Sequence, residues 1–364
     1  MKILIGADLC PKKEEVNKLF VKGDIATLFN DVVELVPKTD RFIVNLECAL
    51  TTSEQTIRKY GSCLKADPRC ADTLKKLGIT DVALANNHVF DFGRKGLSDT
   101  IENLERVGLP YMGIGENDIA SRKIYYMEHT GIKAAVINVC EHEYSYALPD
   151  RIGANPYDPY LTMQDIREAK RNADYVLVLY HGGKEHCRYP SPRLRRLCQE
   201  MIYCGANVVI TQHSHCIGCY ETFENGHILY GQGNFHFCWD NETESWNSGL
   251  LVELTLNEQA EIKFIPFVTA ENQLGITLAQ GERKTQIMRD FEQRNEELKN
   301  GSWEAGWHDF CEKFAGMYRG ALKGLATSET TEEQTQLFAH YLDCEAHTDV
   351  WRELYPTWNK TNEK

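Results

Sequence analysis

Short apolar runs alternate with amphipathic stretches along most of this chain, and residues 81–107 show the pattern most clearly. Residues 82–85 are apolar, too few for a helix and typical of a strand buried on both faces. The polar residues Asn86, Asn87 and His88 follow, and apolar residues then recur at helical spacing over 97–107. The unit predicts a strand, a polar loop and a helix. In an open α/β sheet, ligands bind where strands give way to such loops.

The same pattern recurs before and after this unit. Apolar runs predict strands at 3–7, 42–44, 111–115, 133–140, 175–180, 207–211 and 228–230. Amphipathic spacing predicts helices over 25–36, 68–77, 162–172 with Thr162 as its cap, and 192–204. Residues 250–256 and 261–268 flank a turn and predict an antiparallel hairpin. Strands that alternate with helices indicate an α/β fold.

Two stretches break the alternation, and the last quarter of the chain departs from it. Residues 51–62 are polar and predict a loop, and residues 144–161 predict a long irregular segment, either a substrate wall or a connector. After residue 271 no further apolar strand run is expected, and residues 283–300 and 302–355 predict helices with apolar faces. We therefore expect a main domain at 1–270 and a helical C-terminal extension, 271–364, packed on it.

Composition narrows the class of protein. The formal net charge of −13 argues against a nucleic-acid partner. No run has transmembrane length, and the N-terminus does not resemble a signal peptide. Thirteen cysteines, an odd number, predict reduced thiols and a cytoplasmic location. Cys216 and Cys219 form a C-x-x-C pair that lacks the second pair of a four-cysteine zinc site.

Six side chains of metal-binding types follow the predicted strands. A lone histidine is more often a hydrogen-bonded structural residue than a ligand, but a convergent set favours a metal site. Carboxylates, imidazoles and an amide oxygen suit Mn²⁺, Fe or Zn²⁺ better than Ca²⁺ or Mg²⁺. Two such ions about 3.5–4 Å apart would need a bridging carboxylate, for which Glu47 is the best candidate. The potential ligands are Asp8, Glu47, Asn87, His181, His213 and His215.

Taken in order, these residues resemble the CapA family of bacterial capsule-synthesis proteins associated with poly-γ-glutamate. The resemblance covers roughly residues 1–270. That family is similar to the calcineurin-like metallophosphoesterases, so the resemblance implies a four-layer α/β/β/α sandwich. The motifs that carry it are Asp8, Asn45-Leu46-Glu47, Asn86-Asn87-His88 with Asp91 and Gly93, His181 with Glu185, His213-Ser214-His215, and Gly233-Asn234-Phe235.

The resemblance also implies a role for each residue at a site for two divalent ions. Asp8 and His215 would bind the first ion, and Glu47 would bridge to the second. Asn87, His181 and His213 would bind the second ion. His88 would stabilise the leaving oxygen, with Asp91 to orient it.

The chain departs from the metallophosphoesterase pattern in three places. Cys10 stands where a histidine ligand is usual, and is either a ligand or an apolar neighbour. Glu47 replaces the usual bridging aspartate. Leu50 replaces an aspartate, which removes the expected carboxylate partner of His88.

Four further polar residues and one cluster complete the expectations. Asn45, Asn86, Glu185 and Asn234 are candidate pocket residues, although Glu185 could be a solvated loop charge and Asn234 a turn amide. The cluster Glu141-His142-Glu143 matches no motif, and we expect a surface loop there.

Three functions are compatible with these residues. The first is a metal-dependent hydrolase acting on a phosphoester or related bond. The second keeps the metal site but acts on the γ-glutamyl polymer. The third is a non-catalytic assembly factor that binds a polymer or a protein partner. The sequence predicts a small-molecule or polymer substrate, and says nothing of the oligomeric state or of the role of the C-terminal helices.

Overall fold

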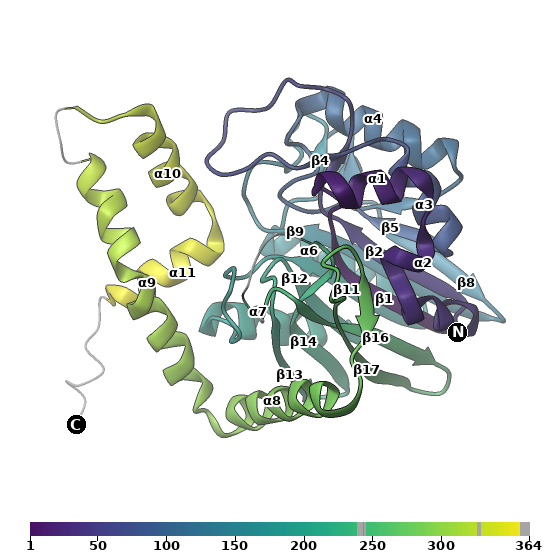
Figure 1. Ribbon diagram of the computed structural model, residues 1–364. Helices are drawn as coiled ribbons and strands as arrows, with labels where there is room; N and C mark the ends of the chain where they lie inside the picture. Colours follow the sequence, from purple (N-terminus) through teal and green to yellow (C-terminus); the bar gives the residue numbers. More distant parts are fainter. Residues whose placement is uncertain (239–242, 244, 326–328, 357–364) are drawn as a thin grey trace.

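The computed structural model describes residues 1–238, 243, 245–325 and 329–356 and contains two large β-sheets that face each other (Figure 1). Each sheet contains a run of parallel strands. The first sheet has eight strands in its described part. Its order is β18 (Ile276–Leu278), β17 (Ala260–Thr269), β16 (Ser248–Leu256), β1 (Lys2–Leu9), β2 (Arg41–Leu46), β5 (Asp81–Ala83) and β6 (Tyr111–Met112), with β15 (Asn234–His236) also paired to β1.

The second sheet holds six described strands and runs from an antiparallel edge through four parallel strands to a second antiparallel edge. Its order is β13 (Ile217–Phe223), β14 (Gly226–Gln232), β12 (Val208–Gln212), β11 (Tyr175–His181), β9 (Ile132–Cys140) and β8 (Tyr125–His129). Two small pairs lie outside the large sheets, β3 (Ala49–Leu50) with β4 (Lys65–Ala66) and β7 (Ile114–Gly115) with β10 (Gly153–Ala154).

Helices cover the outer face of each sheet, so the molecule has four layers. The first sheet is covered by α1 (Glu14–Lys22), α2 (Ile25–Phe29), α3 (Cys70–Leu77) and α4 (Gly93–Arg106), and the second by α6 (Pro159–Asn172) and α7 (Pro192–Tyr203). Between the sheets lies a separate apolar core to which Ile5, Val136 and Ile210 belong. Both faces of each sheet therefore pack against a core, with the two inner faces sharing one, which is why the central strands are nearly continuous apolar runs. The expected α/β/β/α sandwich is confirmed.

The C-terminal part forms four helices in its described residues. They are α8 (Gly281–Asn300), α9 (Trp303–Leu325), α10 (Glu332–Asp343) and α11 (Glu345–Leu354). Buried apolar residues of α9 and α11, among them Trp303, Trp307 and Val350, join the core on the outer face of the second sheet, whereas Ile287 and Phe291 of α8 join the core between the sheets. The helical character of this part is confirmed. The domain boundary at residue 270 stays a prediction.

Several predicted elements differ in extent. The helix expected over 25–36 ends at Phe29, because Asn30 has a φ of 39° and its side-chain amide donates to the carbonyl of Ile276, 246 residues away. The short helices Asn30–Glu34 and Val36–Lys38 follow. The hydrogen bond to Ile276 stabilises a break in the helix that the spacing of apolar residues over 25–36 does not reveal.

Two further expectations were wrong in detail. The helix expected from Thr162 starts three residues earlier, because Asp158 accepts hydrogen bonds from the backbone of Tyr160 and Leu161 and is the true cap. Beyond residue 271, β18 adds a short strand that pairs with β17. Strands β8 and β13 were not anticipated either.

Candidate metal centre

Glu47 is the most unusual side chain of the protein. It follows β2, is completely buried, and neither carboxylate oxygen has a hydrogen-bond partner in the described structure. Burial, with the charge of Asp8 nearby, raises the pKa of Glu47 well above its usual range. A buried carboxylate without partners is costly, so the structure favours a cation at this position.

Two histidines converge on Glu47 from the loop after β12. One ligand atom from each of Glu47, His213 and His215 can be chosen so that all three lie within 4.8 Å of one another. His213 and His215 both have positive φ values, 88° and 53°, which are rare for residues other than glycine. This conformation turns two residues that would alternate in a strand toward one site. Such strain, of order 1–3 kcal/mol per residue, is typical of functional sites.

Asn234 fixes the orientation of His215. The Asn234 amide nitrogen donates to the carbonyl of Trp246 at 3.1 Å, which leaves its Oδ1 as the acceptor 2.8 Å from His215 Nδ1. His215 therefore carries its proton on Nδ1 and keeps the lone pair on Nε2, 3.9 Å from Glu47 Oε1. Hydrogen bonds of this kind orient metal-binding histidines. Burial also lowers the pKa of His215 to about 4, so the ring is neutral at pH 7.

Asn87 and His181 lie on the other side of Glu47. His181, the last residue of β11, has Nε2 3.0 Å from Asn87 Oδ1 and 3.4 Å from Glu47 Oε1. The rings of His181 and His213 are 4.8 Å apart between centroids. The structure thus brings together residues from four strand ends that are distant in sequence.

Asn45 connects His181 to Asp8. Its amide nitrogen donates to Asp8 Oδ1 at 2.7 Å and lies 3.1 Å from His181 Nδ1, while Asn86 donates to Asn45 Oδ1 at 3.1 Å. Asp8 also accepts from the backbone of His213 at 3.0 Å. With Nδ1 of His181 accepting a hydrogen bond, Nε2 carries the proton. Metal binding through His181 Nε2 requires the Asn45 amide to release Nδ1.

His88 has a carboxylate partner despite the leucine at position 50. His88 Nδ1 lies 2.6 Å from Asp91 Oδ2, and Asp91 Oδ1 lies 2.6 Å from Lys59 Nζ. Both Asp91 and Lys59 are almost completely buried. Leu50 removes the carboxylate usual at that position, but Asp91, the expected orienting partner, supplies one from three residues further along the same loop. Lys59 was missed because it lies in a polar loop with no motif.

Glu143 is a second residue that the sequence did not identify, and the expected surface loop at 141–143 was wrong. The Glu143 side chain is 9% exposed, with Oε1 3.6 Å from His213 Nε2. Glu141 is also buried and pairs with Arg193 at 2.7 Å. The only sequence signal for either residue was its position after β9.

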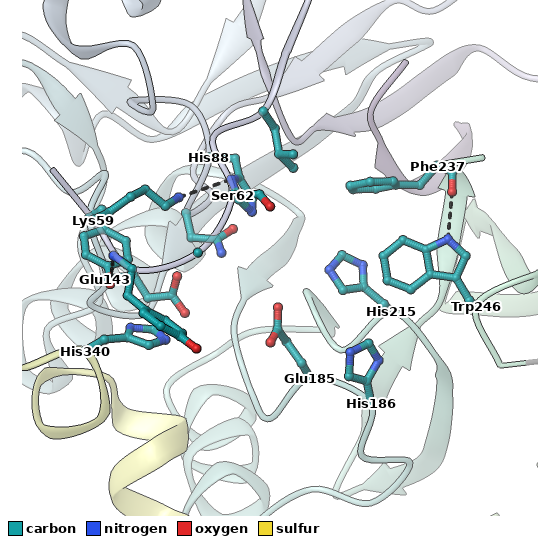
Figure 2. A pocket seen from close by; sticks show the side chains of 15 residues that line it. Lys59, Ser62, His88, Glu143, Glu185, His186, His215, Phe237, Trp246 and His340 are labelled. Atoms are coloured by element: carbon teal, nitrogen blue, oxygen red, sulfur yellow. Dashed lines mark hydrogen bonds between the residues drawn. The ribbon is translucent and has the colours of Figure 1, made fainter. Parts of the chain in front are cut away.

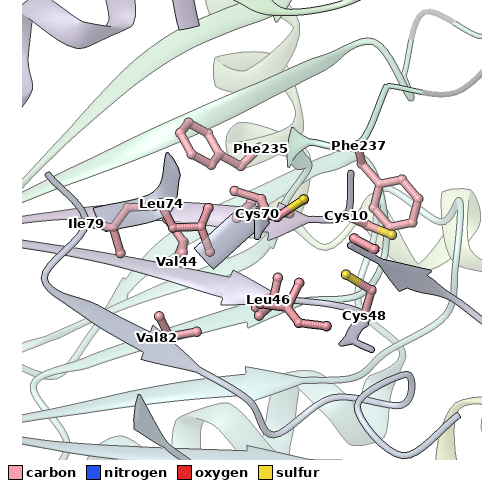
Figure 3. Packing of buried hydrophobic residues seen from close by; sticks show 14 of the residues in the cluster. Cys10, Val44, Leu46, Cys48, Cys70, Leu74, Ile79, Val82, Phe235 and Phe237 are labelled. Atoms are coloured by element: carbon pink, nitrogen blue, oxygen red, sulfur yellow. The ribbon is translucent and has the colours of Figure 1, made fainter. Parts of the chain in front are cut away.

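Cys10 lies in the apolar core between the first sheet and its helices, together with Cys48 and Cys70 (Figure 3). The three-residue group at Glu47 does not include it among the described side chains. Of the two alternatives for Cys10, the apolar neighbour is the one that agrees with this placement. All thirteen cysteines are free thiols.

A cavity of about 320 Å³ opens beside these residues (Figure 2). Lys59, Glu143 and His340 lie on one side of it, and Glu185, His215 and Trp246 on the other. Asn87 and His88 also line it. Glu185 therefore belongs to the pocket. Burial alone would raise its pKa, but Lys184 and the nearby histidines outweigh burial and hold the pKa well below its usual range.

The donor set fits a divalent metal ion. Glu47 provides an orphaned buried carboxylate, His215 an oriented lone pair, and His213 a buried Nδ1 without a partner in the described structure. Such a mixed nitrogen and oxygen set suits Mn²⁺, Fe or Zn²⁺.

Among the helices that the structure describes, none has the length and apolar character needed to cross a membrane.

Comparison with known proteins identifies two curated relatives. The capsule biosynthesis protein CapA of Bacillus anthracis is 32% identical over 48% of this chain and 44% of its own length. The PGA biosynthesis protein CapA of Bacillus subtilis is 30% identical over 48% of this chain and 47% of its own length. These alignments span about half the length of either relative.

More distant matches were also found. A probable polyglutamine synthesis accessory protein of Mycobacterium tuberculosis is 25% identical over 54% of this chain and 55% of its own length. A solved structure of a putative 5′-nucleotidase from Staphylococcus aureus aligns over 80% of this chain and 58% of that chain, with a TM-score of 0.46 and 16% identity. The family model of the bacterial capsule synthesis protein PGA_cap matches residues 7–238, which include most of the residues at the candidate metal centre. The chain therefore belongs to the PGA_cap family of bacterial capsule synthesis proteins.

Proposed function

We propose that this protein is a metal-dependent hydrolase of the metallophosphoesterase type, acting on a phosphoester or related bond. The observation that carries the proposal is Glu47, a completely buried carboxylate whose two oxygens have no hydrogen-bond partner in the described structure, beside His213 and His215. Asp8, Glu47 and His215 would hold one ion, and Glu47, Asn87, His181 and His213 a second. Ions bound there would polarise the scissile group and lower the pKa of bound water.

The residues around the ions have separate tasks. Asp91 holds the proton of His88 on Nδ1, so Nε2, which has no partner in the described structure, is the ring nitrogen available to the substrate. Lys59 balances the charge of Asp91 and contributes a cation to the cavity wall. His88 would contribute a hydrogen bond or proton at the leaving oxygen. Burial, with the charge of Lys59, lowers the pKa of His88, which Asp91 opposes.

A second candidate function is the binding or processing of a capsule polymer. Membership of the PGA_cap family and the names of the CapA relatives favour it. In that case the same cavity would hold part of a γ-linked glutamate chain, with or without catalysis. Cytoplasmic location remains a prediction.

Metal analysis and a substrate screen test the proposal. Protein purified without chelator is analysed for metals, and then screened with Mn²⁺ against phosphate esters and γ-linked glutamate oligomers. Glu47→Gln should lose at least one ion and all turnover, whereas Glu128→Gln, at an exposed position of β8, should lose neither. Equal metal content in wild type and Glu47→Gln would refute the bridging role. Glu141→Ala is a poor control because it would break the buried pair with Arg193.

A further inference from the structure

Helix α10 contributes a histidine to the cavity from outside the segment that the family model matches. His340 lines the cavity together with Lys59 and Glu143, 102 residues beyond the end of the matched segment at residue 238 (Figure 2). Its ring stacks on Tyr144, with 5.5 Å between centroids and 22° between planes. The side chain is thus held against the main body of the protein.

Several contacts fix α10 and the start of α11 at the rim of the site. Tyr146 donates to Asp343 at 3.1 Å, and His142 pairs with Glu345 through its ring at 2.8 Å and its backbone at 2.9 Å. All four residues belong either to the loop after β9 or to the junction of α10 and α11. Tyr146 lies in the segment expected to be a substrate wall or a connector, so this segment also contacts the C-terminal helices.

A buried chain of hydrogen bonds orients the ring of His340. The hydroxyl oxygen of Tyr318, on α9, lies 2.6 Å from His347 Nδ1, and His347 Nε2 lies 3.1 Å from His340 Nε2. Tyr318 and His347 are 2% and 6% exposed. Burial lowers the pKa of His347 well below its ordinary value, so the ring is neutral.

The direction of this chain follows from its first member. The hydroxyl hydrogen of a buried tyrosine needs an acceptor, and His347 Nδ1 is the acceptor found for it in the described structure. His347 then carries its proton on Nε2 and donates to His340 Nε2. His340 must carry its own proton on Nδ1, for which no partner is found in the described part of the chain. A fixed N–H donor without a partner thus remains on a residue that lines the cavity.

We propose that His340 is a substrate-contacting residue that donates a hydrogen bond to an anionic oxygen of the substrate, and that Tyr318 and His347 are its positioning residues. The reaction that follows substrate binding rests on the proposed function, whereas the hydrogen bond from His340 to the substrate does not depend on it. The oxygen belongs either to a phosphate or to a carboxylate. On this basis the C-terminal helices complete the substrate site rather than only cover the second sheet.

The shape of the site supports a substrate that continues past His340. A second cavity of about 530 Å³ lies between the main body and α10, and it shares Lys59, Glu143, Tyr144 and His340 with the first. Arg151 lines this second cavity. His340 is therefore at the junction between the metal-binding end and a further space large enough for another group.

Two probes distinguish the two kinds of anionic oxygen. Mn²⁺-loaded wild type, His340→Phe and Tyr318→Phe are compared for the KM and kcat of p-nitrophenyl phosphate and for calorimetric binding of a γ-linked glutamate decamer. Phenylalanine at 340 keeps the ring against Tyr144 but removes both nitrogens. His308→Phe, at an exposed histidine of α9, is the matched control. Circular dichroism and metal content are measured for every variant.

In His340→Phe the apparent affinity for one of the two probes should fall about 10–100-fold, which is the range for a hydrogen bond to a charged group. Metal content and kcat should be unchanged. Tyr318→Phe should cause a smaller loss for the same probe. A higher KM for the phosphate ester identifies a phosphate oxygen, and weaker decamer binding identifies a carboxylate.

The inference and the proposed function can fail separately. Decamer binding that depends on His340 in a protein without hydrolytic activity would overturn the hydrolase and retain the contact. Unchanged values for both probes in His340→Phe, or a wild type that takes neither probe, would overturn the contact. If Glu47→Gln loses turnover while His340→Phe does not, the proposed hydrolase function is retained and only the His340 contact is overturned.

Discussion

The buried pair of Lys59 and Asp91 should be a major source of stability, and Asp91→Asn tests this without reference to any activity. Asp91 is 0% exposed and Lys59 is 3% exposed at the side chain, with 2.6 Å between Nζ and Oδ1. The other Asp91 oxygen accepts from the backbone of Leu64 at 2.7 Å and contacts His88. Asparagine has the same shape and can still accept from Leu64, so the substitution mainly removes charge.

The loss of unfolding free energy expected for Asp91→Asn follows from the burial of the ion pair. Removing one partner of a buried ion pair leaves the other charge uncompensated, at about 3–5 kcal/mol. An exposed pair contributes only about 0–1 kcal/mol. The pair of Asp67 and Arg69, 2.7 Å apart with side chains 25% and 66% exposed, therefore provides the control substitution Asp67→Asn.

Urea unfolding followed by circular dichroism measures both variants. The free energy of unfolding should fall by at least about 3 kcal/mol in Asp91→Asn and by less than about 1 kcal/mol in Asp67→Asn. The double variant Lys59→Met, Asp91→Asn should recover much of the loss, since no unpaired charge remains. Similar small losses in both single variants would refute the argument that burial makes this pair important.

The pH dependence of the same variant has a defined sign. Burial raises the pKa of Asp91, but His88 and Lys59 outweigh it and hold the pKa below its ordinary value. A carboxylate with a lowered pKa in the folded state stabilises it above the unfolded value, about pH 3.9, and this contribution is lost as the pH falls further. The gap between wild type and Asp91→Asn should therefore close below about pH 4. A gap that stays constant down to pH 2 would contradict the assignment.

Three other substitutions have expected outcomes. His88→Asn should keep the fold and the metals while lowering turnover of any substrate from the screen by about 10²–10⁴, and a metal-loaded variant with wild-type turnover would remove His88 from catalysis. Asn234→Ala should weaken metal binding by about 10–100-fold, because His215 loses its orienting acceptor, and titration with a metal indicator measures this. Gly113→Ala should destabilise the protein by more than about 1 kcal/mol in thermal unfolding, because φ is 84° and a Cβ would overlap the side-chain oxygen of Asn138.

The periodicity of the sequence determined the alternation of strands and helices and which polar residues follow the strands, and the family resemblance implied the four layers. Strands buried on both faces must be apolar along their length, so runs such as 42–44 and 175–180 were visible without any structure. In parallel strands the polar residues that follow meet at one edge of the sheet. This is why Glu47, Asn87, His181, His213 and His215 could be grouped from their positions alone.

Only the tertiary structure decided which other side chains join them. Glu143, Lys59 and His340 come from loops and a helix that carry no periodic signal pointing to the site, and their places depend on how those segments pack. The interruption at Asn30 likewise depends on a carbonyl 246 residues away. Local spacing encodes the elements because burial of each face is periodic. Contacts between distant loops depend on packing and charge pairing in the folded state, and neither leaves a period in the sequence.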